Sequence, residues 1–335
     1  MNYYKVLKIN SLIRSQKLKI LGFGFLLVTN KRFLNIFIDP ILLCNFRCKM
    51  CYFSDPNYKP SKLKFDYDTL KRISQAFFKN ALKLQIGCGA EPLLYKYNSD
   101  IVKLAKQHGV PHISITTNGS LLSFEKIIEL AQAGLNEIII SFHGASDKIY
   151  NKLMPGGDFE KFLNLLQNVS EAKKSFPNLK LRLNYTVNPD NLYDLNNIFD
   201  LLEKYKPDII QIRPIRKLGN SEYKDFDLKK KEKEYEYIIN RIEHFCNDRR
   251  IISILTKNLP SVNITRNIPD IAEYSYCYIS PEHIGDKNFN LNKYSSFRKF
   301  LIKNKICKKI YKDVFLEKTR KVDSDISFAN YEVNV

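Results

Sequence analysis

Short runs of β-branched residues alternate with longer amphipathic segments from about residue 33 to residue 215. The runs have the length of buried strands, and the segments between them repeat apolar residues at helical spacing. Repeated strand–helix units of this kind are typical of a parallel sheet. We therefore predict six strands, at Phe33–Leu42, Lys83–Gly87, His112–Thr116, Glu137–Ser141, Lys180–Thr186 and Ile209–Arg213.

Helices are predicted between these strands. The first opens after Asp66, a residue type that caps helix N-termini, and it places Leu70, Ile73 and Phe77 on one face. The fold class predicted from this pattern is α/β, a partial (β/α)6 TIM-type barrel with a C-terminal extension. The other predicted helices cover Asp100–His108, Ser123–Ala133, Phe159–Lys174 and Leu192–Tyr205.

The pattern changes after about Gly219. A Lys- and Glu-rich helix is predicted at Asp227–Cys246 and a strand-like run at Ile251–Thr256, and an irregular tail follows. We therefore predict three parts, which are a basic N-terminal arm at 1–32, a core barrel at 33–220 and a C-terminal extension at 221–335.

The formal net charge of +19 raises the question of a nucleic-acid partner. Lysine is spread along nearly the whole chain, so we expect no nucleic-acid partner, although an RNA substrate stays open as an alternative. Positive charge is in excess at the N-terminus, because no acidic residue precedes Asp39. Such an arm suits peripheral contact with an anionic membrane or an anionic substrate, and equally a solvated helix or hairpin over the barrel bottom. Its basic residues are Lys5, Lys8, Arg14, Lys17, Lys19, Lys31 and Arg32.

Composition excludes two further classes of protein. Apolar residues make up 44% of the chain and aromatic residues 13%, too many for a mostly disordered protein. No apolar run approaches the ~20 residues of a membrane span. The stretch Ile20–Val28 is short and has no small-residue cleavage site after it, so no secretory signal is predicted and a cytoplasmic location is expected.

Three of the seven cysteines lie within eight residues, in the sequence Cys44-Asn-Phe-Arg-Cys48-Lys-Met-Cys51. Thiolates are the ligands of iron–sulfur clusters, and three of them leave one iron of a cubane open to a small molecule. A zinc site is the alternative, but tetrahedral zinc needs a fourth ligand and no Cys or His follows at zinc-finger spacing. The spacing therefore favours a 4Fe–4S cluster.

Unusual residues also follow the next three predicted strands. In barrels of this kind, reactive groups come from the C-terminal ends of the strands and the loops after them. The positions after these strands should therefore be functional. Their sequences are Gly87-Cys88-Gly89-Ala90-Glu91-Pro92, Thr117-Asn118-Gly119 and Ser141-Phe142-His143-Gly144.

These motifs together resemble the radical S-adenosylmethionine superfamily, over about residues 33 to 220. C-x-x-x-C-x-x-C after a first barrel strand is that family's signature. Gly89-Ala90-Glu91-Pro92 resembles its G-G-E-P turn, and Thr117-Asn118-Gly119 resembles its T-N-G after the third strand. Two departures are Ala90 in place of a glycine, which crowds the backbone, and Met50 where an aromatic residue is frequent.

The resemblance implies two cofactors, a 4Fe–4S cluster and S-adenosyl-L-methionine. It implies Cys44, Cys48 and Cys51 as the metal ligands. The reduced cluster would cleave S-adenosylmethionine to a 5′-deoxyadenosyl radical, which takes hydrogen from a peptide or a small biosynthetic substrate. The implied contacts to S-adenosylmethionine are Gly89, Ala90, Glu91, Asn118, Ser141 and Asn184.

The partners and the alternatives follow from the same resemblance. A reductant such as flavodoxin or ferredoxin is expected, and no catalytic residue is assigned. Two other functions stay open, an RNA-modifying radical enzyme and a non-catalytic metal-binding scaffold that uses the barrel for binding.

Four further cysteines and one histidine have a structural interpretation as well as a functional one. Cys88 and Cys246 are expected to be buried thiols without a ligand role. His143 suits a proton-transfer role or a structural hydrogen bond equally well. Cys277 and Cys307 resemble the remnant of a SPASM or twitch extension, which holds auxiliary clusters in relatives. Two thiols do not fill a four-ligand site, so a degenerate extension without a second cluster is expected.

Overall fold

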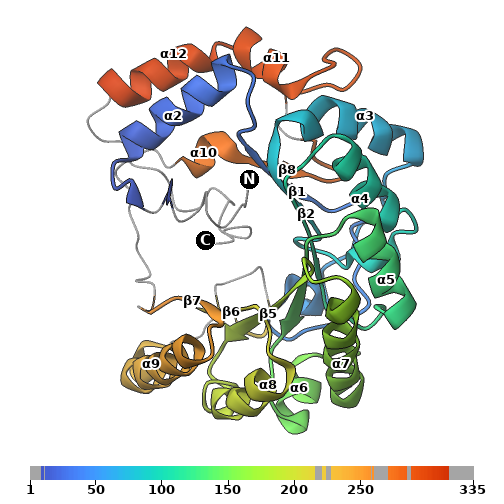
Figure 1. The fold of residues 1–335 in the computed structure, drawn as a ribbon, viewed down its shortest axis with the longest axis vertical. Coiled ribbons are helices and arrows are strands. Elements are labelled where there is room, and N and C mark those ends of the chain that lie inside the picture. The colour runs from blue at the N-terminus through green and yellow to red at the C-terminus, as the bar shows by residue number, and fades with distance from the viewer. Residues whose placement is uncertain are drawn as a thin grey trace. The chain divides into compact units, whose positions relative to one another are not determined.

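The computed structural model describes residues 9, 10, 12–215, 221–223, 228–257, 259, 271–284 and 288–316 (Figure 1). Lys5 and Lys8 of the predicted arm lie outside the described residues, as does Asp227 at the predicted start of the Lys- and Glu-rich helix.

Eight strands of the described residues follow the order β7-β6-β5-β4-β3-β2-β1-β8 in an open parallel sheet. The predicted α/β class with a partial barrel is confirmed, and all six predicted strands are present. β7 (Ile252–Leu255) pairs with β6, and β8 (Tyr276–Ile279) pairs with β1. The others are β1 (Leu34–Ile38), β2 (Ala81–Ile86), β3 (His112–Thr117), β4 (Glu137–Phe142), β5 (Lys180–Val187) and β6 (Ile209–Pro214).

The chain divides into two compact units. Unit 1 comprises residues 1–42, 63–114 and 263–335, and unit 2 comprises residues 43–62 and 115–262. Unit 1 therefore contains β8, β1 and β2, whereas unit 2 contains β4 to β7. The cysteine loop belongs to unit 2 and the glycine turn after β2 belongs to unit 1.

The helices of unit 1 pack beside β8, β1 and β2. Asp66 caps α3 as predicted, because its carboxylate accepts the N–H of Thr69 at 2.7 Å. No helix of the described residues has both the length and the apolar character needed to cross a bilayer. The helices are α2 (Gln16–Val28), α3 (Tyr67–Phe77), α4 (Asn98–Gln107), α10 (Ala272–Ser275), α11 (Phe297–Lys303) and α12 (Ile306–Tyr311).

The helices of unit 2 match the predicted ones with three changes, one of which is α6, a helix that was not predicted. The helix predicted at Leu192–Tyr205 is split, because residues Tyr193–Asn197 form a 3-10 helix, η4, before the α-helix begins. Asp194 in this turn accepts hydrogen bonds from the loop after β4, which fixes its geometry. The helix predicted at Asp227–Cys246 starts at Glu232. The helices are α5 (Phe124–Ala133), α6 (Asp147–Leu153), α7 (Phe159–Ser175), α8 (Ile198–Tyr205) and α9 (Glu232–Asp248).

The two faces of the sheet in unit 2 differ in polarity. Ser141, Asn184 and Gln211 are partners in the register of β4, β5 and β6, so their side chains leave the sheet on the same side. The neighbouring positions point to the other side and are apolar. There Phe142 stacks on Phe162 of α7, with ring centroids 5.2 Å apart. The helices therefore cover an apolar face, and the polar face is left for function.

Candidate functional site

The three cysteines lie on the irregular loop that follows β1, and each is half-buried. The N–H of Cys51 donates to the carbonyl oxygen of Cys48 at 2.8 Å, which turns the loop tightly between these two cysteines. The loop is also tied to the segment after α6. The N–H of Arg47 donates to Pro155 O at 2.9 Å, and that of Lys49 donates to Leu153 O at 3.0 Å.

Two glycines after α6 allow this close approach. Gly156 has a φ of +97°, and a Cβ there would lie 3.1 Å from Asn45 O. A Cβ on Gly157 would lie 3.0 Å from Phe46 Cε2 and 2.9 Å from Tyr150 Cε1. A side chain at either position would push on the cysteine loop or on the helix before it. The sequence Gly156-Gly157 is thus a part of the site that the sequence analysis missed.

Asn118 connects the end of β3 to the cysteine loop. Its Nδ2 donates to Asn45 Oδ1 at 2.9 Å and lies 4.0 Å from Cys44 Sγ. Its Oδ1 accepts from the N–H of Ser120 at 3.0 Å, and Asn45 Nδ2 donates to the Ser120 hydroxyl at 2.8 Å. The structure therefore brings one predicted S-adenosylmethionine contact together with one predicted metal ligand. Asn45 and Ser120 were not predicted.

The Cys51 thiol lies in buried surroundings that also contain polar groups. Burial raises the pKa of the Cys51 thiol above its ordinary value, and backbone N–H groups of Phe53 and Tyr52, together with the charge of Arg47, oppose this rise. No three Cys, His, Asp or Glu side chains among the described residues are gathered as ligands of one metal ion. The assignment of the three thiols therefore stays a prediction.

The glycine turn after β2 is held by a buried carboxylate. Asp39, which follows β1 and is 1% exposed, accepts the N–H of Cys88 at 2.7 Å and that of Gly89 at 2.9 Å. The hydroxyl of Tyr278 in β8 donates to the same carboxylate at 2.8 Å. Burial raises the pKa of Asp39, although these hydrogen bonds favour its charged form. Asp39 therefore fixes the backbone of the predicted binding turn.

Sequence reasoning passed over this role of Asp39. A signal was present, since an aspartate directly after a buried apolar strand and before a proline is an unusual choice. The partner on β8 was not readable, because no strand was predicted at Tyr276–Ile279. Strand β8 lies within the predicted C-terminal extension and, in the structure, within unit 1, where its Tyr278 supports the turn.

The remaining residues of the turn have local roles. Gly87 has a φ of +85° and donates its N–H to Ile38 O at 2.8 Å, which starts the turn. Glu91 is buried, and its Oε1 accepts the N–H of Leu93 at 3.1 Å at the start of a 3-10 helix. Gly89 and Ala90 are half-buried at the apex. Their contacts to S-adenosylmethionine stay a prediction.

Ser141 and Asn184 lie side by side on the polar face of unit 2, as register partners in β4 and β5. The side-chain oxygen of Asn184 accepts from Arg182 Nε at 2.9 Å, and Arg182 also donates to Gln211. Arg182 is 2% exposed and lies 3.8 Å from Glu137. This buried group orients Asn184, and neither Arg182 nor Gln211 was singled out from the sequence.

His143 follows β4 on the same side of the sheet and is half-buried. Its Nδ1 accepts the N–H of Thr186 at 3.4 Å, and its carbonyl oxygen accepts from Asn191. Desolvation lowers the pKa of His143 to about 3, with a further contribution from the charge of Arg213. The ring is therefore neutral at pH 7, which fits the structural hydrogen bond more directly than a proton-transfer role.

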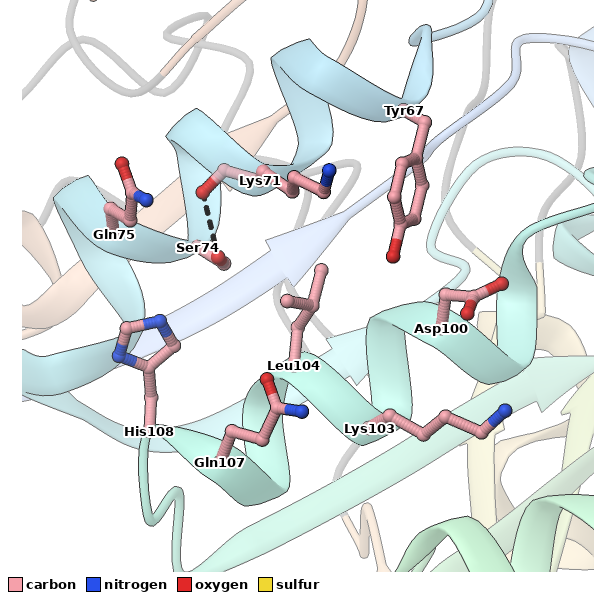
Figure 2. Close-up of a pocket in the computed structure, with 9 residues that line it drawn as sticks. All are labelled: Tyr67, Lys71, Ser74, Gln75, Asp100, Lys103, Leu104, Gln107 and His108. Carbon is pink, nitrogen blue, oxygen red and sulfur yellow. Dashed lines mark hydrogen bonds between the residues drawn. The ribbon is translucent and has the colours of Figure 1, made fainter.

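A pocket of about 370 Å³ lies between α3 and α4 in unit 1 (Figure 2). Figure 2 shows that its walls come from two helices, with Tyr67 and Lys71 on α3 facing Asp100 and Lys103 on α4. None of the predicted site residues lines it. The pocket therefore belongs to the outer helical layer of unit 1 and not to the candidate site.

The other cysteines are placed as follows. Cys246 on α9 is buried, as expected. Cys277 on β8 is also buried. Cys88 was expected to be buried and is half-buried, because it lies at the turn and not within the strand. Cys307 on α12 is exposed. The absence of an auxiliary cluster at Cys277 and Cys307 stays a prediction.

Comparisons of sequence match this arrangement. Residues 38–202 match the model of the radical SAM superfamily. The "Probable GTP 3',8-cyclase" of Saccharolobus islandicus strain L.S.2.15 is 27% identical over 199 residues, which are 58% of this chain and 61% of the relative. The protein of the same name from Methanocaldococcus jannaschii is 27% identical over 218 residues, 64% of this chain and 66% of the relative. The chain thus spans less than two thirds of these curated relatives.

Solved structures show the same fold. Streptococcus suis SuiB bound to S-adenosylmethionine has a TM-score of 0.58 at 19% identity, over 77% of this chain and 61% of that chain. anSMEcpe with bound AdoMet has a TM-score of 0.54 at 18% identity, over 66% of this chain and 63% of that one. At these identities the likeness shows the fold alone.

The residues present fit the cofactors of this superfamily, whose members are enzymes that use a 4Fe–4S cluster and S-adenosylmethionine. Three half-buried thiols supply the donor set that such a cluster needs. The buried oxygens Asn35 Oδ1 and Gln85 Oε1 in unit 1, and Thr116 Oγ1 in unit 2, accept no hydrogen bond from the described residues and suit a polar ligand. From its motifs, its fold and the match at residues 38–202, this chain carries a domain that matches the radical SAM superfamily.

Proposed function

We propose that this chain cleaves S-adenosylmethionine reductively and starts radical chemistry on a peptide or a small biosynthetic substrate. The observation that carries the proposal is the loop with Cys44, Cys48 and Cys51, placed directly after β1 in a chain with a domain that matches this superfamily. When bound, the cluster and S-adenosylmethionine together supply a 5′-deoxyadenosyl radical that abstracts hydrogen. A flavodoxin or a ferredoxin is the proposed source of the electron.

The residues of the chain bind and orient these groups. The three thiols bind three corners of the cluster, so one iron is left for the amino and carboxylate groups of S-adenosylmethionine. Asp39 accepts the N–H groups of the glycine turn, and the carbonyl side of these peptides suits an ammonium group. Ser141 and Asn184 offer hydroxyl and amide groups for the ribose or the carboxylate.

Two classes of substrate have support from different proteins. The curated relatives are named for a reaction of GTP, which favours a small molecule. A structural neighbour, SuiB, is bound to the precursor peptide SuiA at a TM-score of 0.57, which favours a peptide. The predicted contact of the N-terminal arm with an anionic membrane involves none of the site residues and is a separate proposal.

The test is anaerobic reconstitution of the full chain with iron, sulfide and dithionite. We expect about four irons and four sulfides per chain, and release of 5′-deoxyadenosine when S-adenosylmethionine is added. The variant Cys44→Ala/Cys48→Ala/Cys51→Ala should lose the iron and the 5′-deoxyadenosine. Cys307→Ala is the matched control, because that thiol is exposed on α12 and should keep both.

Other outcomes would contradict parts of the proposal. Zinc without sulfide would indicate the non-catalytic scaffold, and no release of 5′-deoxyadenosine by a fully loaded protein would exclude the radical reaction. About eight irons, of which four survive in the triple variant, would show an auxiliary cluster. Consumption of GTP, of a peptide or of bound RNA in the same assay would then assign the substrate class.

A further inference from the structure

Helix α2 is apolar on two opposite faces, and the described residues of the chain cover only one of them. Ile20, Phe23 and Leu27 follow one another at intervals of three or four residues and are buried in unit 1. Phe23 packs on Phe33 and Tyr274, with ring centroids 5.2 Å and 5.4 Å away. The opposite face is exposed to solvent, with 60% of Leu18, 39% of Leu21, 68% of Phe25 and 62% of Val28 accessible.

The C-terminal helices of unit 1 adjoin α2. Figure 1 shows α2 and α12 side by side, and α2 also contacts the turn at Lys312–Leu316. A Cβ on Gly24 would lie 3.5 Å from Ile310 Cδ1, so the two helices are in close contact. The guanidinium of Arg298 on α11 donates to Leu27 O at 2.6 Å and to Val28 O at 2.8 Å. These contacts hold α2 beside α11, α12 and the turn at Lys312–Leu316.

Both adjoining segments are basic, and Asp313, the one acidic residue within 288–316, is buried. Residues 288–312 contain eight lysines and arginines and no aspartate or glutamate, and residues 9–38 contain no acidic residue either. Arg32 is used structurally, since its guanidinium donates to the carbonyl oxygens of Phe78, Ala81 and His108. Other cations of the two segments are exposed at the surface, among them Arg14, Lys17, Lys305, Lys308 and Lys312.

We infer that this region, called here the α2 surface (Leu18, Leu21, Phe25 and Val28 with Lys17, Lys308 and Lys312), docks on an anionic lipid bilayer. An apolar helix face flanked by lysines is the composition that inserts at the boundary between headgroups and acyl chains. Lysines near such a surface are attracted by anionic lipids. The docking does not depend on the radical reaction, because the residues of the two sites are different.

Two other occupants fit the α2 surface less well. A nucleic acid would neutralise the lysines, but it would leave Leu18, Phe25 and Val28 in water. A second copy of this chain would bury the apolar face, but it would bring two basic surfaces of the same sign together. A bilayer with anionic headgroups would bury the apolar face and would also neutralise the charge of the lysines.

The experiment is flotation of the full chain with vesicles of phosphatidylcholine containing 30% phosphatidylglycerol (about one lipid in three). We expect binding at low salt, at least tenfold weaker binding to vesicles of phosphatidylcholine alone, and loss of most binding in about 0.5 M NaCl. The variant Leu18→Ser/Phe25→Ser should bind at least tenfold more weakly. Lys308→Glu/Lys312→Glu should weaken binding by roughly tenfold.

Matched controls separate docking from folding. Leu63→Ser removes a leucine of similar exposure, 52%, from another part of unit 1, and it should bind as the unmodified chain does. Lys230→Glu/Lys233→Glu makes the same charge change near or on α9 and should have a smaller effect. Circular dichroism must show that every variant is folded.

Four results would overturn the inference. The first is equal binding to charged and uncharged vesicles, and the second is unchanged binding of Leu18→Ser/Phe25→Ser. The third is a dimer in light scattering that Phe25→Ser dissociates, which would make a second copy the occupant. RNA that binds the chain and is lost in Lys308→Glu/Lys312→Glu but not in Leu18→Ser/Phe25→Ser would point to nucleic acid.

Discussion

The cysteine loop of unit 2 and the glycine turn of unit 1 are both irregular segments after parallel strands, but they are held in different ways. The cysteine loop is fixed by many weak ties, which include backbone bonds to Leu153 and Pro155 and the amide contacts of Asn118. The glycine turn depends on one carboxylate, Asp39, which accepts two backbone N–H groups and the hydroxyl of Tyr278.

The difference follows from what each segment has to present. A loop that offers three thiols to a cluster needs its side chains placed, and the cluster itself would hold them once it is bound. A turn that recognises a small molecule through its backbone needs its peptides placed before the ligand arrives. A buried carboxylate that takes up two adjacent N–H groups preorganises these peptides. The comparison therefore predicts that one substitution, at Asp39, has a large effect on the turn. Single substitutions in the cysteine loop should each have a smaller effect.

The largest effect is expected for Asp39→Ala, which strands the N–H groups of Cys88 and Gly89 without an acceptor. Each buried group without its partner costs about 1–3 kcal/mol, so the loss of both should lower the free energy of unfolding by about 2–6 kcal/mol. We also expect at least tenfold weaker binding of S-adenosylmethionine to the reconstituted protein, measured by anaerobic calorimetry. Asp68→Ala is the matched control, because the Asp68 side chain is 89% exposed. Normal affinity in a destabilised Asp39→Ala protein would show that the turn is preorganised by other contacts.

The next effect concerns the cysteine loop. In Gly157→Ala the new methyl group would lie 3.0 Å from the carbonyl oxygen of Met154 and from Phe46 Cε2, so the loop or the helix has to shift. We expect a loss of about 1–3 kcal/mol of stability and a lower iron content after reconstitution. Gly22→Ala is the control, since nothing lies within 4 Å of its Cβ and alanine favours the helix by about 1 kcal/mol. A full iron content in Gly157→Ala would indicate that the remaining ties suffice.

The sequence predicted some parts of the two segments and their surroundings, but not others. The six strands and the positions of the cysteines follow from local pattern and spacing, and both are properties of short segments. Strand β8 was missed because a four-residue strand in an irregular tail has no period to detect. Its pairing with β1 joins residues more than 200 positions apart in sequence, and no local signal reports such a contact.

The candidate site shows the same division. Asn118 was predicted from its own motif, whereas Asn45, Ser120 and Gly157 matter only through contacts with segments that lie elsewhere in the sequence. Asp39 was visible in the sequence, but its role required the position of the turn after β2. Motifs therefore located the groups that are predicted to touch a cofactor, and the residues that position them became clear only in the structure.

A pH experiment tests a titrating group of unit 2. His143 in unit 2 has a pKa lowered to about 3 by burial, so the folded chain keeps the ring neutral while the unfolded chain protonates it below pH 6.5. Stability should therefore fall as the pH is lowered from about 6.5 toward 3, by about 1–2 kcal/mol because water reaches part of the ring. His143→Gln should reduce this loss in urea denaturation at pH 7.5 and 5, whereas His244→Gln, an exposed position on α9, should not. An equal loss in His143→Gln would exclude His143 as its source.

The smallest effect is expected for Tyr278→Phe, which removes one of the three donors to Asp39 and leaves the backbone donors in place. We expect about 1 kcal/mol of lost stability and at most a threefold change in the affinity for S-adenosylmethionine. Tyr237→Phe is the control, because Tyr237 is 65% exposed on α9. If Tyr278→Phe weakened the affinity as much as Asp39→Ala does, the turn would depend on the bond from β8 and not on the pair of backbone donors. The C-terminal extension would then control the binding site, and the turn would be held, like the cysteine loop, by contacts between segments that lie far apart in sequence.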